Sequence, residues 1–292
     1  MYEWTRVSDN CSYIQSPAKI GIYEIGDNRA VLIDSGNDKD AGRKIRQMLR
    51  DRNLTLEAIF NTHSHADHIG GNHYLQSQYN CRIYASPSEL SFVLNPELEP
   101  SYLYGGFPIG ELRGKFLIAQ ESNAEILTDD ALPSGLSSFA LPGHSFGMVG
   151  YKTDDGIVFL ADCLCSKQTL DKYGVLYVYD VASYVKTLDT VRGMQARLFI
   201  PSHAEPTENI APLVDYNKAK VFEFGEVLTE FCHEPIDVET MLKSVFVTYE
   251  RSMNYEQYAL VGSTVRSYLA WLQNQGVITC FIDRHRLLWK KA

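Results

Sequence analysis

Three histidines and one aspartate fall within six consecutive positions, in the segment His63-Ser64-His65-Ala66-Asp67-His68. Imidazole and carboxylate groups together suit Zn²⁺, and they also suit iron or manganese. A helix would turn residues 63 and 65 about 200° apart, so we interpret the segment as a turn that follows the apolar strand at 58–60. A single histidine is more often a structural residue, but four candidate ligands in six positions predict a metal site.

Three further apolar segments each end in a residue that can bind a metal ion, and they lead to His144, Asp162 and His203. Another apolar strand at 30–33 runs into Asp34. Asp34 either lies at the carboxyl edge of a sheet or only caps the next helix. The recurrence of a strand that ends in a ligand-type residue predicts that these side chains line one edge of a sheet sandwich.

The predicted elements run as β-hairpins followed by β-α-β-α-β, which is typical of a layered α/β domain. Apolar spacing predicts amphipathic helices at 38–52, 72–79, 181–195 and 210–232. Residues 86–133 hold five prolines and an aromatic run, and they are the least regular part of the chain. Long insertions are often lids or binding loops. We therefore expect a cap over the metal site, with a surface excursion or a dimer contact as the alternatives.

A break at His233-Glu234-Pro235 divides the chain into predicted domains at 1–235 and 236–292. In the second domain we expect helices at 238–249 and 261–274 and a hairpin over 277–290. Two helices followed by a hairpin predict a small winged-helix module. Residues 237–292 carry seven lysines and arginines against five acidic residues. We expect this module to shape the substrate pocket or a subunit contact, with RNA contact as the alternative.

The overall composition excludes some classes of function. A net charge of −9 argues against a surface that binds nucleic acid through overall positive charge. No stretch approaches the ~18 apolar residues of a membrane span, and the first residues lack a secretory signal pattern. We therefore expect a cytoplasmic protein with no membrane partner. The six cysteines form no CxxC pair, so we expect them to be reduced and mostly buried.

The ordered series of candidate ligands resembles that of the metallo-β-lactamase-fold hydrolases, over about residues 12–232. The resemblance implies a four-layer αββα sandwich with its metals at one edge of the paired sheets. It implies that one metal is bound by His63, His65 and His144 and that the second is bound by Asp67, His68 and His203. Asp162 would bridge both metals. Asp34 would contact the metal ligands without binding a metal itself.

Asp162 stands where some true β-lactamases have a cysteine, so the ligand set is similar to that of the glyoxalase-II subgroup. β-Lactam hydrolysis is therefore not the expected main activity. We interpret Cys163 and Cys165, which flank Asp162, as residues of the core or of the surroundings of the site rather than as ligands.

The resemblance implies two divalent cofactor ions, with Zn²⁺ expected and iron or manganese as alternatives. A hydroxide shared by two such ions can attack a carbonyl or phosphoryl centre, and Asp67 is the expected proton acceptor. The expected substrate is a small thioester, ester or lactone. Two alternatives stay open: an endoribonuclease, because the C-terminal module is similar to that of lactamase-like endoribonucleases, and a mononuclear-iron sulfur dioxygenase. A homodimer is also left open.

Overall fold

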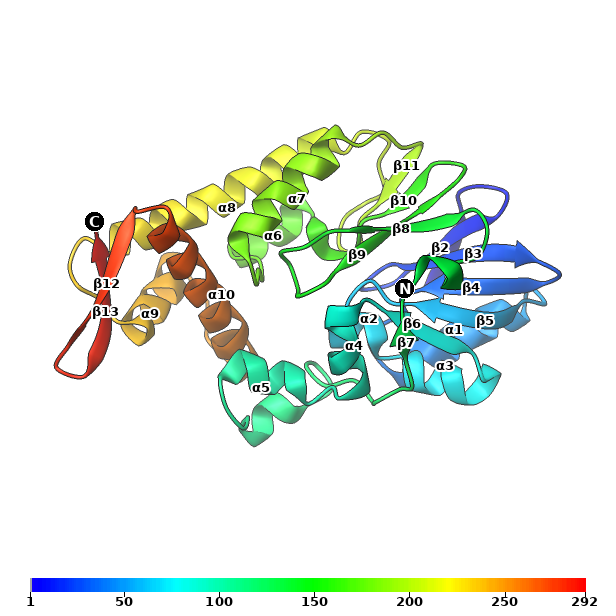
Figure 1. Cartoon of the computed structure of the whole chain (residues 1–292), viewed down its shortest axis with the longest axis horizontal. Helices are drawn as coiled ribbons and strands as arrows, with labels where there is room; N and C mark the ends of the chain where they lie inside the picture. Colours follow the sequence, from blue (N-terminus) through cyan, green and yellow to red (C-terminus); the bar gives the residue numbers. More distant parts are fainter. Residues whose placement is uncertain (1) are drawn as a thin grey trace.

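The computed structural model describes residues 2–292. A seven-stranded sheet has the order β1-β2-β3-β4-β5-β6-β7, a four-stranded sheet has the order β11-β10-β9-β8, and β12 and β13 form a separate hairpin (Figure 1). The first sheet comprises β1 (Glu3–Arg6), β2 (Cys11–Gln15), β3 (Ile20–Gly26), β4 (Arg29–Ile33), β5 (Thr55–Phe60), β6 (Arg82–Ala85) and β7 (Glu125–Ile126). The others are β8 (Leu136–Ala140), β9 (Val149–Thr153), β10 (Ile157–Phe159), β11 (Leu198–Ile200), β12 (Ile278–Asp283) and β13 (Arg286–Lys291).

The helices lie between and after these strands. They are α1 (Lys39–Arg50), α2 (Ala66–Ile69), α3 (Asn72–Tyr79), α4 (Pro87–Leu94), α5 (Leu98–Tyr104), α6 (Lys167–Tyr173), α7 (Val181–Gly193), α8 (Ala211–Phe231), α9 (Val238–Thr248) and α10 (Tyr255–Asn274), with short 3₁₀ helices η1 (Gly110–Arg113), η2 (Asp129–Ala131) and η3 (Ala161–Cys163). Among residues 2–292, no helix combines the length and the apolar character that a membrane span requires.

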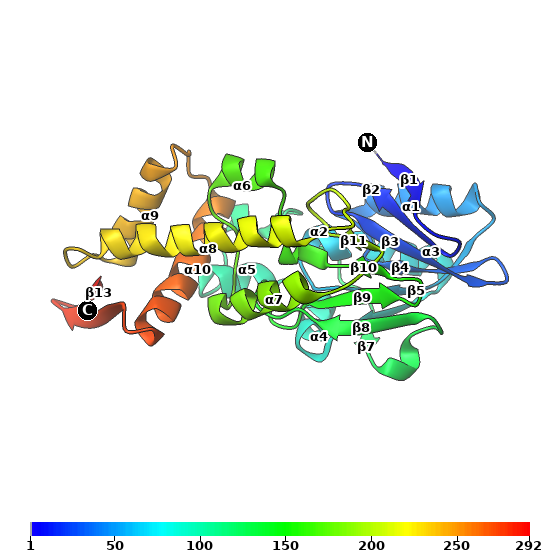
Figure 2. The same cartoon turned by 90° about the horizontal axis from the view of Figure 1, so that it is seen from above.

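Alternation along β4 shows how the layers form. Val31 and Ile33 pack between the two sheets, against Phe159 and Ile200 of the second sheet. Ala30 and Leu32 point to the other face of the first sheet, where they pack against α1 and α3. Successive side chains of a strand point to opposite faces, so β4 can be buried on both sides. On the outer face of the second sheet, Val158 of β10 and Phe199 of β11 share a buried cluster with side chains of α7 and α8. Figure 2 shows α8 running from this sheet toward the C-terminal elements. The predicted αββα architecture is confirmed.

Two helix boundaries follow from capping side chains. The carboxylate of Asp38 accepts hydrogen bonds from the backbone N–H groups of Asp40 and Ala41, which starts α1 close to the predicted position. The Asn254 side chain accepts a hydrogen bond from the Gln257 N–H, so α10 begins at Tyr255. This start is earlier than the predicted position 261, because the cap lies outside the apolar spacing on which that prediction relied.

The expectation that residues 86–133 are largely irregular is wrong for their first half. They form α4 and α5, followed by η1, β7 and η2. Pro87 occupies the first turn of α4, where its missing N–H and fixed φ are compatible with a helix. Proline therefore starts a helix here, although the sequence prediction took the prolines of this segment as signs of irregular chain.

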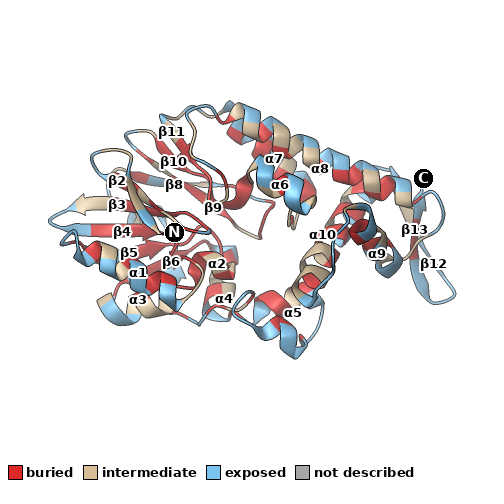
Figure 3. Cartoon of the chain, turned by 180° about the vertical axis from the view of Figure 1, so that it is seen from behind, coloured by how far each residue is buried: buried red, intermediate tan, exposed pale blue. Residues whose placement is uncertain are grey.

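The C-terminal elements have the predicted order of two helices and a hairpin, and their assignment as a winged helix stays a prediction. Their core is continuous with that of the sandwich, because Phe224 and Leu228 of α8 belong to the same buried cluster as Leu242 of α9 and Leu269 of α10. The hairpin is mostly exposed, whereas the strands of both sheets are mostly buried (Figure 3). The boundary at residue 235 likewise stays a prediction, and the buried cluster runs across it.

Candidate metal centre

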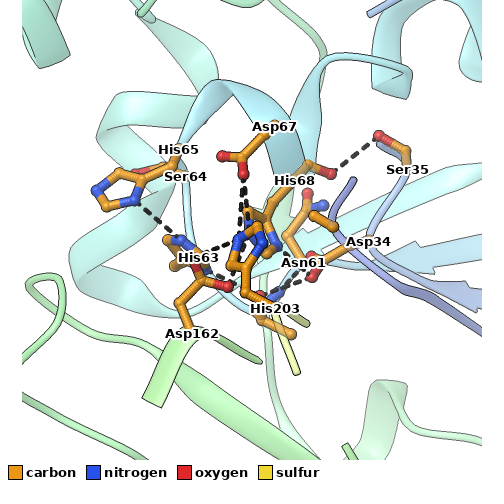
Figure 4. A network of polar contacts seen from close by, with 12 residues as sticks. Asp34, Ser35, Asn61, His63, Ser64, His65, Asp67, His68, Asp162 and His203 are labelled. Atoms are coloured by element: carbon orange, nitrogen blue, oxygen red, sulfur yellow. Dashed lines mark hydrogen bonds and ion pairs between the residues drawn. The ribbon is translucent and has the colours of Figure 1, made fainter. Parts of the chain in front are cut away.

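The predicted ligands leave the sheets at one edge. β4 and β5 are parallel and end level with each other, so Asp34 and the histidine segment emerge together from the first sheet. β10 and β11 are also parallel and end level, which brings Asp162 and His203 together at the end of the second. His144 follows β8 of the same sheet. In Figure 4 the labelled side chains of His63, Asp67, His68, Asp162 and His203 gather around one place, with Asp34 beside His68.

The side chains form two groups, each with its potential ligand atoms within 4.8 Å of one another. The first, the three-histidine group, consists of His63, His65 and His144. In it, Nδ1 of His65 lies 3.0 Å from Nε2 of His63 and 3.1 Å from Nε2 of His144. Three imidazole nitrogens therefore face a common point.

The second group, the aspartate-histidine group, consists of Asp67, His68, Asp162 and His203. Oδ1 of Asp162 lies 3.0 Å from Nε2 of His68, and Oδ2 of Asp162 lies 3.0 Å from Nε2 of His203. An oxygen of Asp67 lies 3.4 Å from Nε2 of His203. Asp162 also lies 3.6 Å from Nε2 of His144, so its carboxylate stands between the two groups.

Acceptors behind the rings orient most of these imidazoles. Nδ1 of His144 donates to the Tyr177 carbonyl at 3.1 Å, and Nδ1 of His203 donates to the Pro17 carbonyl at 3.0 Å. A proton fixed on Nδ1 leaves the Nε2 lone pair of a neutral ring pointing into the site. The backbone thus selects the tautomer that a metal requires.

Asp34 orients two further residues from below the site. It accepts hydrogen bonds from the Thr62 N–H at 2.8 Å and from the Thr62 hydroxyl at 2.7 Å, and it lies 2.8 Å from Nδ1 of His68. Because the Thr62 hydroxyl donates to Asp34, its oxygen is free to accept from Nδ1 of His63, 3.0 Å away. Asp34 reaches this position with a left-handed φ of 64°. Its side chain therefore serves the site, whereas Asp38 caps the next helix.

The donor set fits a divalent metal. Nε2 of His68 and Oδ1 of Asp162 are buried and lack a hydrogen bond of good geometry, although they lie 3.0 Å apart. Buried polar atoms of this kind are costly unless a partner satisfies them. A cation between them would satisfy both, and imidazole and carboxylate ligands suit Zn²⁺, iron or manganese.

The pKa values of the two groups differ in direction. Burial lowers the pKa of His65 to about 4 and that of His144 to about 3, and the pKa of His63 also falls well below its ordinary value. Burial also disfavours protonation of His68 and His203, but the charges of Asp162 and Asp67 outweigh it and raise both pKa values well above 6.5. Without a metal, the first group is neutral and the second is a network of ion pairs.

Two buried glutamates behind the site were not predicted from the sequence. Glu89 of α4 accepts hydrogen bonds from the Ser64 N–H at 3.0 Å and the Ser145 hydroxyl at 2.7 Å, and it also accepts one from the Gly147 N–H at 2.6 Å. It therefore ties the loop of His63 and His65 to the loop of His144. No local sequence signal separates this acid from others at helix starts.

Glu99 of α5 is the second of these glutamates. Its Oε1 lies 3.5 Å from Nε2 of His65, the nitrogen that faces away from the other histidines. Burial, together with the charges of Glu89 and Asp67, raises the pKa of Glu99 to about 8. Residues 86–133 thus place two buried carboxyl groups beside the three-histidine group, and Glu89 is the one that hydrogen-bonds its loops.

A cavity of about 410 Å³ opens over both groups. Besides the candidate ligands, its lining includes the apolar or aromatic Pro17, Ala66, Phe116, Leu117, Tyr177 and Leu260. Asn37, Glu99 and Lys115 are its other polar lining residues. Phe116 and Leu117 come from residues 86–133, and the assignment of this segment as a cap insertion stays a prediction. Cys163 is fully buried and Cys165 is half-buried. Neither belongs to the two groups that could hold a metal.

Comparison with known proteins assigns the family. The family model described as the Metallo-beta-lactamase superfamily matches residues 14–203. The chain belongs to this superfamily. The solved structures agree with the assignment: a beta-lactamase domain protein from Burkholderia ambifaria superposes with a TM-score of 0.77 at 16% identity, over 99% of this chain and 94% of that one. A metallo-beta-lactamase family protein from Thermus thermophilus has a TM-score of 0.74 at 16% identity, over 100% and 98%. At this identity they show the fold, which includes the C-terminal elements.

Curated relatives of this superfamily are named as hydrolases. The probable metallo-hydrolase YqgX of Bacillus subtilis is 30% identical over 52% of this chain and 66% of its own length. The hydroxyacylglutathione hydrolase of Thiobacillus denitrificans is 29% identical over 56% of this chain and 52% of its own length. The chain thus spans between half and two thirds of these two relatives. It is a metallo-hydrolase-type member of the superfamily with a histidine and aspartate metal-binding cluster.

Proposed function

We propose that this protein is a hydrolase with two divalent metal ions, expected to be Zn²⁺, that cleaves a small thioester, ester or lactone. The observation that carries the proposal is the meeting of the two ligand groups at Asp162, below a single largely apolar cavity. The similarity to hydroxyacylglutathione hydrolases supports the thioester class, because an acylated glutathione is a thioester.

Each ligand group is proposed to hold one ion. The three-histidine group would hold the first through His63, His65 and His144, and Asp67, His68 and His203 would hold the second, with Asp162 shared. Divalent ions in such a centre supply an activated water at neutral pH and polarise the substrate carbonyl. Asp34 and the backbone acceptors keep the rings in place while the charge of the site changes.

Asp67 is the proposed proton acceptor for the attacking water. Its side chain is 40% exposed and lines the cavity, whereas the side chain of Asp162 is 9% exposed. Burial opposes ionisation of Asp67, but His68 and His203 lower its pKa to about 2, so it is a carboxylate at neutral pH. The apolar wall of Phe116, Leu117 and Leu260 would exclude bulk water from the substrate carbonyl.

The test combines metal analysis with turnover. The purified protein is expected to bind close to two zinc ions per chain and to hydrolyse members of a panel of thioesters, esters and lactones. Asp67→Asn keeps the shape of the side chain but removes both the base and a carboxylate ligand of the second ion, and we expect kcat to fall by about 10²- to 10⁴-fold. Asp130→Asn, at an exposed position of η2, is the control and is expected to match the wild type.

Three results would overturn the proposal. Full loading with zinc but no turnover anywhere on the panel would exclude the thioester, ester and lactone class. A single iron with oxygen uptake would indicate the sulfur dioxygenase alternative. Cleavage of single-stranded RNA that is lost in Asp67→Asn would indicate the endoribonuclease alternative, and steep salt dependence of binding would accompany it.

A further inference from the structure

A second cavity adjoins the one over the metal centre. It has a volume of about 490 Å³, and it shares Phe116, Tyr177 and Leu260 with the first. Three side chains are thus the common boundary of two spaces, each within the size range of small-ligand pockets. A ligand that reaches past this boundary can have its reactive group at the metal centre and the rest of its length in the second cavity.

The walls of the second cavity are largely apolar. Val175 and Leu176 come from the segment after α6, Phe246 comes from α9, and Val261 comes from α10. The polar part of the lining consists of Arg251, Asn254, Glu256, Gln257 and Thr264, of which Arg251 and Asn254 are exposed. The apolar wall suits an apolar chain, and the polar side chains can face solvent or the polar end of a ligand.

The boundary itself carries an exposed aromatic side chain. Phe116 is 63% exposed, although it lines both cavities. Burial of apolar surface is favourable, so a ligand that crosses this boundary would gain by covering Phe116. Helices α9 and α10 supply much of the second cavity, so the C-terminal elements take part in substrate binding in this arrangement. Figures 1 and 3 show α10 beside α5 of the insertion.

We propose that the second cavity binds an unbranched apolar acyl chain of the substrate, while its thioester or ester bond lies at the metal centre. The inference rests on the proposed function for the reaction itself. For a thioester, the acyl C–S bond breaks, the oxygen of water bonds to the acyl carbon, and a proton passes to the leaving thiolate. Water is the only co-reactant.

The expected consequence is a dependence on chain length. Each methylene that enters the cavity should improve binding by about fourfold, until the space is filled. The kinetic probes are N-acetylcysteamine thioesters with acyl chains of increasing length, from acetyl to decanoyl. The binding probes are the matching thioethers, S-ethyl- and S-decyl-N-acetylcysteamine, which cannot be hydrolysed. Their dissociation constants are measured by calorimetry on the metal-loaded protein.

Two variants fill the cavity from two different elements. Val261→Phe adds bulk from α10, and Leu176→Trp adds bulk from the segment before α7. Both are expected to weaken binding of the S-decyl thioether by at least tenfold and to reduce the decanoyl-to-acetyl ratio of kcat/KM by at least as much. Val247→Phe places the same substitution at a position of α9 that is 67% exposed and outside the cavity. This control is expected to bind like the wild type.

The outcomes separate this inference from the proposed function. Thioester turnover that is independent of chain length, and unchanged in both filling variants, would overturn the acyl-chain site and leave the hydrolase proposal standing. Tight binding of the S-decyl thioether that both variants abolish, with no turnover of any thioester, ester or lactone on the panel, would support the apolar-chain site and overturn the hydrolase proposal. If one filling variant does not fold, the other still decides.

Discussion

The two ligand groups occupy the same edge of the sandwich but are held in different ways. The three-histidine group is neutral, and the insertion supports it through Glu89 and Glu99. The aspartate-histidine group is charged, and Asp34 supports it from the end of β4 in the first sheet. Through Glu89, residues 86–133 thus brace the loops of the three-histidine group, whereas Asp34 contacts His68 directly and His63 through the Thr62 hydroxyl. Changes in the two halves should therefore have different effects on metal binding and stability.

Asp162→Ala should have the largest effect, because its carboxylate stands between the groups. The variant keeps all three histidines of the first group and removes both oxygens that face His68 and His203. We expect it to bind about one metal per chain and to lose about a thousandfold or more in kcat, since several kcal/mol of transition-state stabilisation depend on the ions. Metal analysis and turnover of the best thioester measure both effects.

The matched control is Asp130→Ala, at an exposed position of η2. Its metal content and kcat should equal those of the wild type. If Asp162→Ala retains two metals with full activity, Asp162 is not shared between the groups, and the distinction between the two halves of the site is wrong.

Glu89→Gln should have the next largest effect, and its effect should be confined to the three-histidine side. The amide nitrogen would face the N–H of Ser64, the hydroxyl of Ser145 or the N–H of Gly147, so at least one buried donor loses its acceptor. Such a loss costs about 1–3 kcal/mol. We expect a reduction of that size in the free energy of unfolding of the metal-free protein, measured in urea.

Metal affinity shows which ligand group the Glu89→Gln substitution affects. In the double variant Glu89→Gln/Asp162→Ala, the one remaining metal should bind about 10- to 100-fold more weakly than in Asp162→Ala alone, because residues that orient metal ligands contribute that much to affinity. Glu97→Gln, at an exposed position just before α5, is the control. Unchanged stability in Glu89→Gln would show that the insertion does not hold the histidine loops.

Much of this site could be predicted from the sequence, and the reason is local. Each ligand follows a short apolar strand, so a polar residue after an apolar run marks the edge of a sheet without knowledge of the fold. Glu89 could not be predicted in this way, because its partner Ser145 lies 56 positions away and only the folded chain brings them together. The α10 start was misplaced because capping by Asn254 is a polar signal outside the apolar spacing.

The smallest expected effect is on the number of protons released when a metal binds. This number differs between the two ligand groups. Asp162 and Asp67 raise the pKa values of His68 and His203 well above 6.5, so both rings hold a proton at pH 7 that a metal must displace. In the three-histidine group, the pKa values of about 4 and about 3 mean that His65 and His144 are already neutral. Metal affinity of the aspartate-histidine group should therefore rise with pH from pH 6 to 8, and that of the three-histidine group should change little.

Calorimetry in buffers of different ionisation enthalpy counts the released protons. Zinc binding to the wild type at pH 7 should release close to two protons more than binding to Asp162→Ala, in which only the three-histidine group is complete. If zinc binding to the three-histidine group of Asp162→Ala released as many protons as binding to the wild type, the assigned charges would be wrong. Asp34→Asn gives an independent check, because the neutral amide removes one of the charges that keep His68 protonated. It should release fewer protons than the wild type, and its amide nitrogen replaces one of the two oxygens that face Thr62 and His68.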